Sequence, residues 1–351
     1  MSSVTEMVLD SELGIPRFIF VTGASRSGTT MLSRILGNAD NCVSLNELHF
    51  FGELVPVAEK PVILSRDQAC FAVAMTLARH ARDVWVRETS RSEWAEAQRI
   101  VNSLTEGRLT GDAVFAAMIK VIAAKAGASH NCEQTPRNIF YARHLLNAFP
   151  NADVVHVVRD PRAVMSSQKS RYRVRRLGGR NVPIREVIRL WLNYHPVTMV
   201  RLWRAATREA QILSGNRRFT IVRYEDLITQ PVQTVSAVCQ RLGIVFQEKI
   251  LEVPHWGSST VVHPSRSGIS GASLDKWRTM LTTTEIAYCE SATKQERESF
   301  GYDALEDCKP TIFGIVKFVL RFPVHVLGVV LANPRRMLVQ IRAMFRSKAG
   351  N

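Results

Sequence analysis

The chain of 351 residues has only six cysteines, and none of them form a C-x-x-C pair. They are scattered as Cys42, Cys70, Cys132, Cys239, Cys289 and Cys308. A zinc site or a disulfide framework needs cysteines clustered at short, regular spacings. We therefore expect reduced, structural cysteines. We expect no metal site, since no Mg²⁺-binding signature is evident either.

The first residues lack a long apolar run. The opening segment, MSSVTEMVLDSELG, contains Glu6, Asp10 and Glu12. Secretory and transit peptides avoid acidic residues and, for secretion, need an apolar stretch. We expect residues 1–15 to form a loose leader and the protein to be cytoplasmic, peripheral on a membrane if its tail binds one.

Acidic residues are missing after Asp307, although the whole chain carries a net charge of +15. Much of the excess lies in this tail and in a second basic block, residues 169–185. Neither segment has the interleaved aromatic residues of a nucleic-acid stacking platform. The charge instead favours an anionic small ligand, an acidic acceptor or a membrane surface. For the block at 169–185, a solvated helix face is the simpler explanation.

Apolar residues make up 46% of the chain, enough for a substantial core. Three β-branched runs, residues 18–22, 154–158 and 220–223, have the pattern of strands buried on both faces. Strands that alternate with helices predict a doubly wound, mainly parallel α/β domain, here over residues 16–307. The predicted helices cover residues 30–36, 69–82, 112–126, 139–149, 164–171, 184–208 and 231–242.

The most informative segment is RFIFVTGASRSGTT, residues 17–30. Gly23 and Gly28 have the spacing of a Walker phosphate loop, but Thr29 stands where a nucleotidase has lysine. The loop still offers backbone amides at a helix N-terminus, which favours an anion. Arg26 is the cation within the loop. The pattern suits a 5′-phosphate that carries something other than a phosphate chain.

A second segment, VVHVVRDPRAVMSS at residues 154–167, also has an apolar strand that leads into a helix. Arg159 comes at the carboxyl end of a strand, Asp160 is placed to cap a helix, and Pro161 suits its first turn. Arg159 and Ser167 can converge on one phosphate. The alternative is a helix start with Arg159 as a surface ion-pair partner.

These two segments together resemble the sulfotransferase family that uses 3′-phosphoadenosine 5′-phosphosulfate (PAPS), most closely its carbohydrate and tyrosylprotein branches and their bacterial relatives. The resemblance runs from about Phe18 to about Tyr302. It implies that the 5′-phosphosulfate is held by the loop residues Arg26, Ser27, Gly28, Thr29 and Thr30. It also implies that Arg159 and Ser167 hold the 3′-phosphate. The acceptor stays open, since a carbohydrate, a lipid and a tyrosyl hydroxyl all fit the family.

The same resemblance implies a catalytic base in the segment SLNELHFF, where Glu47 matches the catalytic glutamate of the tyrosylprotein-type branch. We expect Phe50 and Phe51 to shield this carboxylate and raise its pKa, which makes a better base near neutral pH. His49 is the rival, because imidazole titrates in the useful range. Otherwise Glu47 is a surface acid and His49 a loop residue.

One family position differs. In EQTPRN, Gln134 stands where the family usually has lysine, and Arg137 is the cation that could compensate. The difference leaves open an inactive nucleotide-binding module that acts on a membrane through its tail. A P-loop kinase is a further alternative, but it would need a lysine at position 29 and an acidic metal ligand.

Two later segments also match the family. Tyr224 lies in RYEDL, which we interpret as structural with contacts near the nucleotide. The loop SRSGISGASLDKWR, residues 265–278, ends in the cations Lys276 and Arg278. In the family such a loop closes over the 3′-phosphate and adenine, which implies a lid here. A solvated surface loop is the alternative.

The chain ends in a basic tail, residues 308–351, with a long apolar segment at 311–332. This segment is long enough to cross a bilayer, but Lys317, Arg321 and His325 form a polar stripe and Pro323 interrupts it. We expect an amphipathic helix. It lies either in an anionic membrane interface or on the protein's own core or a second subunit.

Overall fold

The computed structural model describes residues 16–58, 60–105, 109–171, 176–177, 180–181, 184–253, 269, 271–305 and 308–332. The chain divides into two compact units. The sheet unit holds the described residues up to Arg159, those of 206–253, and residues 269 and 271. The helical unit holds residues 160–205 and the described residues from 272 onward. The predicted division between a domain at 16–307 and a tail at 308–351 stays a prediction.

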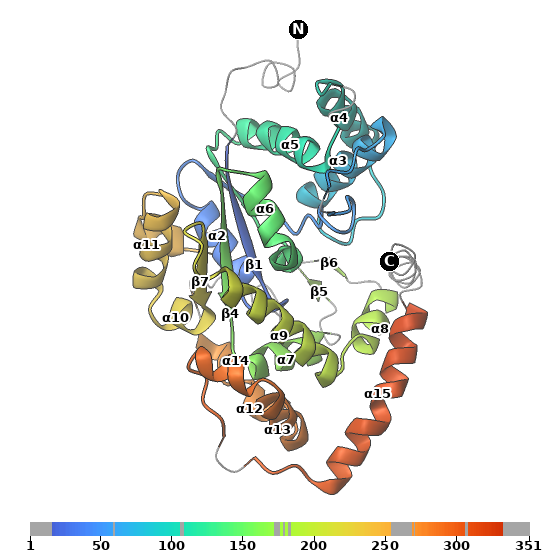
Figure 1. Ribbon diagram of the computed structural model, residues 1–351, viewed down its shortest axis with the longest axis vertical. Coiled ribbons are helices and arrows are strands. Elements are labelled where there is room, and N and C mark those ends of the chain that lie inside the picture. The colour runs from blue at the N-terminus through green and yellow to red at the C-terminus, as the bar shows by residue number, and fades with distance from the viewer. Residues whose placement is uncertain are drawn as a thin grey trace. The chain divides into compact units, whose positions relative to one another are not determined.

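The sheet unit is built on a five-stranded parallel sheet with the strand order β2-β3-β1-β4-β7. Its strands are β1 (Arg17–Gly23), β2 (Cys42–Ser44), β3 (His130–Glu133), β4 (Ala152–Val158) and β7 (Phe219–Arg223). The three predicted apolar strands are confirmed as β1, β4 and β7, which run side by side (Figure 1). The α/β fold class is thereby confirmed.

β2 and β3 were not predicted, because they are short and carry no apolar run. Their sequences are CVS and HNCE. β3 pairs with β1 on one side and with β2 on the other, so it forms only in the company of its neighbours. Tertiary pairing rather than local propensity defines these two strands.

The helices of the sheet unit begin at clear sequence signals. Ser65 and Ser90 form capping boxes at the starts of α3 and α4, and Thr110 caps α5. The helical elements of this unit are α2 (Thr29–Gly37), α3 (Arg66–Ala81), α4 (Arg91–Asn102), α5 (Gly111–Lys125), η1 (Pro136–Tyr141), α6 (Ala142–Ala148), α10 (Tyr224–Thr229), α11 (Pro231–Leu242) and η3 (Glu248–Leu251). The helices predicted over residues 30–36, 69–82, 112–126, 139–149 and 231–242 are confirmed as α2, α3, α5, α6 and α11, whereas α4, α10 and η3 were not predicted.

Phenylalanines join the helices to the sheet. Phe18 of β1 packs with its ring centroid 4.8 Å from that of Phe149 and 5.9 Å from that of Phe115 on α5. Phe50 and Phe51 contact the same Phe115 ring at 5.1 and 4.9 Å. These buried rings fix the loop that follows β2 onto the core, which is where the predicted base lies.

Among its described residues, the helical unit contains helices and a short antiparallel pair of strands. Its elements are α7 (Pro161–Lys169), β5 (Arg176–Leu177), β6 (Arg180–Asn181), α8 (Ile184–Leu192), the first part of α9 (Pro196–Leu213), α12 (Trp277–Met280), α13 (Thr283–Ala292), α14 (Lys294–Ser299) and α15 (Ile312–Ala332). A short turn, η4 (Gly271–Ser273), precedes α12. Arg162 ties α7 to α13 through Glu290, at 2.6 Å, and stacks on Trp277 at 4.1 Å.

The prediction of one helix over residues 184–208 was wrong. The chain leaves the helical conformation after Leu192 and starts again at Pro196. Proline disfavours the helical conformation of the residue before it and cannot donate the next backbone hydrogen bond. Pro196 therefore opens α9 instead of continuing α8, and His195 at the break is fully buried.

His156 gives a pH-dependent test of the sheet unit. It lies in β4 with Nδ1 3.2 Å from the hydroxyl of Thr22, and burial lowers its pKa to about 3. In the unfolded chain its pKa is about 6.5. Below that pH the unfolded state binds a proton that the folded state does not, so acid lowers the free energy of unfolding by about 1.4 kcal/mol per pH unit.

We expect His156→Gln to remove this contribution, because glutamine does not titrate. Urea unfolding at pH 6.5 and pH 5 measures it. The wild-type protein should lose about 2 kcal/mol more than the variant over this interval. An equal loss in both proteins would show that His156 is not a source of acid sensitivity.

Candidate nucleotide-binding and catalytic site

The predicted phosphate loop connects β1 to α2 without a side-chain cap. Gly28 is the N-cap residue, with φ of 100°, and no side chain accepts a hydrogen bond from the first turn of α2. Arg26 also has a positive φ, 82°. A Cβ at Gly23 would lie 2.7 Å from the carbonyl oxygen of Val157, so the loop is pressed against β4. The amides at this helix N-terminus are therefore available to an anion.

Arg159 meets this loop from the end of β4, as the strand order allows. Its side chain is only 2% exposed, so the alternative of a surface ion-pair partner is wrong. Its Nη1 donates a hydrogen bond to the carbonyl oxygen of Arg26 at 3.1 Å. Asp160 follows and caps α7 by accepting from the amide of Arg162, as predicted.

Tyr224 joins the two segments. The guanidinium of Arg159 lies 4.1 Å from the centroid of its ring. On the loop side, a Cβ at Gly28 would be 2.4 Å from Cδ2 of the same ring. Only a glycine fits there, for its positive φ and for this close approach. The ring of Tyr224 therefore packs between Gly28 of the loop and the guanidinium of Arg159.

The hydroxyls of the loop have different surroundings. Ser27 is fully buried, and its Oγ has no hydrogen-bond partner among the described residues. Thr29 is buried as well. Thr30 is exposed and donates to Oε1 of Gln134 at 3.0 Å. Buried hydroxyls are normally hydrogen-bonded, so the Ser27 hydroxyl marks a place where a polar ligand atom fits.

Gln134, which stands where the resemblance leads us to expect lysine, is an uncharged residue that contacts the loop. It is buried, and its amide group is engaged with Thr30 through the oxygen. Arg137, the cation proposed to compensate, has an exposed side chain on η1.

A buried carboxylate next to Gln134 has no role in the sequence-based prediction. Glu133 accepts hydrogen bonds from the hydroxyl and amide of Thr135 and from Nδ2 of Asn138. Burial raises its pKa, while the bonds to Thr135 lower it to a smaller extent. The available signal was its position as the first residue of the EQTPRN segment, which is the carboxyl end of β3.

Thr135 connects Glu133 to the turn that carries the predicted base. Its Oγ1 accepts hydrogen bonds from the amides of Leu48 and His49 at 3.2 and 3.1 Å. Arg79 holds the other side of the turn by donating to the carbonyl oxygen of Leu48 at 2.8 Å. The turn that carries the predicted base is therefore fastened to the same segment that contacts Thr30.

Glu47 and His49 are neighbours in this turn. Oε2 of Glu47 lies 3.2 Å from Nε2 of His49, and the two side chains are 30% and 18% exposed. The backbone of His49 has a positive φ of 49°, in the left-handed region. Both candidates for the base thus occupy one partly exposed site and interact directly.

The remaining predicted residues belong to the helical unit. Ser167 lies on α7 and is partly buried. Lys276 and Arg278 are exposed at the start of α12, where Arg278 pairs with Asp275 at 3.1 Å and stacks on Trp277. Part of the predicted lid at 265–278, namely residues 265–268 and 270, lies outside the described residues. Of the basic block, Lys169 forms an ion pair with Glu285 at 2.6 Å, which is a structural role.

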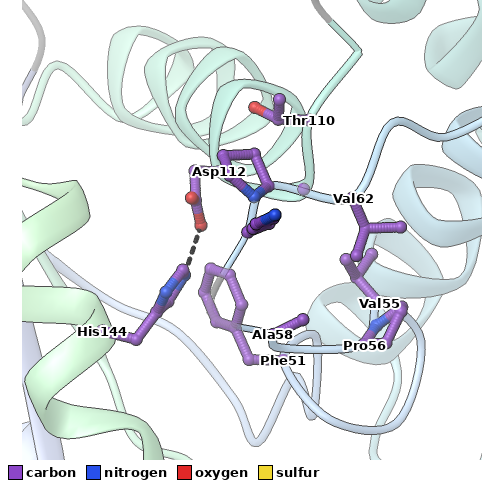
Figure 2. Close-up of a pocket in the computed structure, with 11 residues that line it drawn as sticks. Phe51, Val55, Pro56, Ala58, Val62, Thr110, Asp112 and His144 are labelled. Atoms are coloured by element: carbon purple, nitrogen blue, oxygen red, sulfur yellow. Dashed lines mark hydrogen bonds and ion pairs between the residues drawn. The ribbon is translucent and has the colours of Figure 1, made fainter. Parts of the chain in front are cut away.

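A separate pocket lies at the base of α5. Figure 2 shows it between Phe51, Val55 and the start of α5, beside the contact between Nε2 of His144 and Oδ1 of Asp112 at 2.8 Å. None of the predicted site residues lines it. None of the six cysteines takes part in a disulfide in the structure. Among the described residues, no three His, Cys, Asp or Glu side chains gather into a metal-binding group.

The parallel sheet and its loop define a protein of the phosphate-loop α/β class. Residues 16–248 match the sequence model of the Sulfotransferase family, and the protein belongs to that family. Its fold is similar to the sulfotransferase domain of the Synechococcus PCC 7002 olefin synthase, with a TM-score of 0.53 at 21% identity, over 84% of this chain and 98% of that domain.

Curated relatives are distant. Carbohydrate sulfotransferase 1 of Danio rerio is 24% identical over an alignment of 185 positions, which covers 44% of this chain and 39% of the relative. Nodulation protein NoeE of Sinorhizobium fredii is 23% identical over 286 residues, 78% of this chain and 62% of the relative. The matches thus span less than two thirds of the length of these relatives.

Proposed function

We propose that this protein transfers a sulfuryl group from PAPS to an acceptor hydroxyl. The observation that carries the proposal is the junction of the lysine-free phosphate loop with buried Arg159 through Tyr224. It supplies two anion-binding elements at adjacent strand ends. A donor with a 5′-phosphosulfate and a 3′-phosphate matches two such elements, whereas a nucleoside triphosphate needs the lysine that Thr29 replaces.

The residues of the loop fit the 5′-phosphosulfate. The uncapped amides of α2 and the buried hydroxyl of Ser27 provide donors, and Arg26 provides a charge. Thr29 and Thr30 complete the loop. Arg159 is proposed to hold the 3′-phosphate with Ser167, and Lys276 and Arg278 to contact the same end of the nucleotide, as the family resemblance implies.

The transfer breaks the bond between sulfur and the 5′-phosphate oxygen and forms a bond between sulfur and the acceptor oxygen. The proposed base Glu47 takes the acceptor's proton, and the bridging oxygen leaves with 3′-phosphoadenosine 5′-phosphate (PAP). Charge that develops on the leaving phosphate is stabilised by the loop amides and Arg26. Positioning and electrostatics do most of this work, as in phosphoryl transfer.

A carbohydrate hydroxyl is the first acceptor to test, because one distant relative is named a carbohydrate sulfotransferase. Lipid and tyrosyl hydroxyls remain in the same proposal. An acidic acceptor would suit the net charge of +15.

An inactive nucleotide-binding module is the second candidate, and Gln134 is the observation that favours it. The glutamine brings no charge to the loop and is already bonded to Thr30. Such a module would bind PAPS without turning it over.

Calorimetric titration and a transfer assay test both candidates. We expect PAP to bind at least about tenfold more tightly than ATP, because ATP offers no 3′-phosphate for Arg159. Radiolabelled PAPS with a panel of sugars, lipids and tyrosyl peptides should then yield a labelled acceptor. Tight PAP binding with no transfer to any acceptor and no donor hydrolysis would favour the inactive module. Preference for ATP would contradict both.

A further inference from the structure

The C-terminal helix α15 is attached to the helical unit by one narrow stripe. Figure 1 shows α15 beside α8. Within the stripe, Phe318 and Phe322 pack on His195 with ring centroids 5.1 and 5.0 Å apart. Nδ1 of His325 is 2.7 Å from the carbonyl oxygen of Leu192, and its Nε2 is 2.9 Å from the hydroxyl of Thr198.

Glycines allow this helix to approach closely at both ends of the stripe. A Cβ at Gly314 would be 2.2 Å from Oγ1 of Thr284, and one at Gly328 would be 2.8 Å from Cδ2 of Leu192. Residues 314, 318, 321, 325 and 328 follow the spacing of one helix face. The docking face is therefore fixed in register, and the opposite face points away from the helical unit.

The opposite face is apolar and exposed. Side chains along its length are 43–83% exposed: Ile312, Phe313, Ile315, Val316, Val319, Leu320, Val324, Val326, Leu327 and Leu331. An ordinary soluble helix has its apolar face on the protein and its polar face in water, whereas most apolar side chains of α15 are exposed. An apolar surface of this extent marks an interaction site.

Helix α8 extends the same kind of surface. Ile184, Ile188 and Trp191 recur at helical spacing and are 78%, 53% and 46% exposed. Arg321 of α15 lies 5.9 Å from the ring centroid of Trp191, so the two helices meet at this edge. Tryptophan and arginine at the rim of an apolar surface are typical of a membrane–water interface.

The charges distinguish a lipid surface from a second copy of the chain. From residue 308 to the C-terminus the sequence has eight Lys or Arg residues and no Asp or Glu. Two such surfaces would repel each other in a homodimer, whereas anionic head groups attract them. α15 is long and apolar enough to cross a membrane: its mean hydropathy is 1.8, and only 11% of the apolar window is buried in the protein. Its docking stripe, however, holds Arg321 against α8 and His325 against α9. That attachment favours a helix in the plane of the membrane.

We propose that the exposed faces of α15 and α8 form a membrane-docking surface, which binds anionic phospholipid with α15 lying in the interface. The apolar side chains enter the boundary between head groups and acyl chains. Lys317 and Arg321 remain at head-group level. This inference is independent of the proposed sulfotransferase activity.

Co-sedimentation of the full-length protein with vesicles tests the proposal. One set of vesicles is made of phosphatidylcholine alone, and the other also contains about 30% phosphatidylserine. We expect binding to the phosphatidylserine vesicles that weakens at high salt. The double variant Val319→Glu/Leu327→Glu should bind roughly tenfold or more weakly, because two carboxylates oppose insertion. The matched control Ile212→Glu/Val245→Glu changes two exposed apolar residues elsewhere by the same charge and should bind like the wild type.

Folding of each variant is checked by its melting temperature and by PAP titration. Absence of wild-type binding to either vesicle, or equal binding by both double variants, would overturn the proposal. If light scattering shows a wild-type dimer that becomes monomeric in Val319→Glu/Leu327→Glu, while vesicles are not bound, a second copy covers this surface instead.

Discussion

Replacing Arg159 by alanine is expected to weaken binding of PAP by roughly 100-fold, about 2.7 kcal/mol. Arg159 is buried at the end of β4, and a guanidinium there can form charge-assisted hydrogen bonds to a 3′-phosphate. Removing it also takes a hydrogen bond from Arg26 and a stacking partner from Tyr224. The loop itself is therefore expected to bind somewhat less well too.

The comparison with adenosine 5′-phosphosulfate, which lacks the 3′-phosphate, separates these two effects. We expect the affinity for that ligand to fall only a few-fold. Calorimetry on both ligands then gives the ratio of the two affinity losses, in which any general weakening of the loop cancels. Arg143→Ala removes a 60% exposed arginine of the same unit that is outside the predicted site, and serves as the control with near wild-type affinities. Equal losses for the two ligands would remove Arg159 from the 3′-phosphate site.

The second large effect is expected for Glu47→Gln. Loss of a general base costs about 10²- to 10⁴-fold in turnover, since glutamine accepts a hydrogen bond but not a proton. The anchoring bonds of this turn come from Thr135 and Arg79 to backbone atoms, and the substitution leaves those atoms in place. PAP affinity should therefore stay within about twofold of the wild type.

His49→Gln is the matched control, because it changes the direct partner of Glu47 in the same turn. We expect a smaller loss of turnover than for Glu47→Gln. Single-turnover rates with saturating donor measure both variants without interference from product release. If His49→Gln abolishes turnover and Glu47→Gln does not, the imidazole is the base.

Much of the sheet unit follows from its sequence. Apolar runs predict β1, β4 and β7, and Ser65, Ser90 and Thr110 start their helices by local capping. β2 and β3 do not follow, because a strand of three or four mixed residues is stable only when its neighbours pair with it. The break before Pro196 was a local signal, but the strong helical periodicity on either side obscured it.

The candidate site shows the same division. The loop at Gly23 to Thr30 and the position of Arg159 at a strand end were predicted from local pattern and family resemblance. The packing of the Tyr224 ring between Gly28 and Arg159 was not predicted, since these residues are distant in sequence. Nor was the chain of hydrogen bonds by which Glu133 and Thr135 hold the turn of Glu47.

By itself the sequence determined the α/β class, the phosphate loop without its lysine, and the basic, acid-free tail, because each depends on neighbouring residues or on composition. Only the tertiary structure decided how closely Tyr224 packs the loop against Arg159, and which face of α15 the protein covers. Those features depend on contacts between segments far apart along the chain, where close packing and hydrogen-bond geometry select one arrangement among many that the local pattern allows.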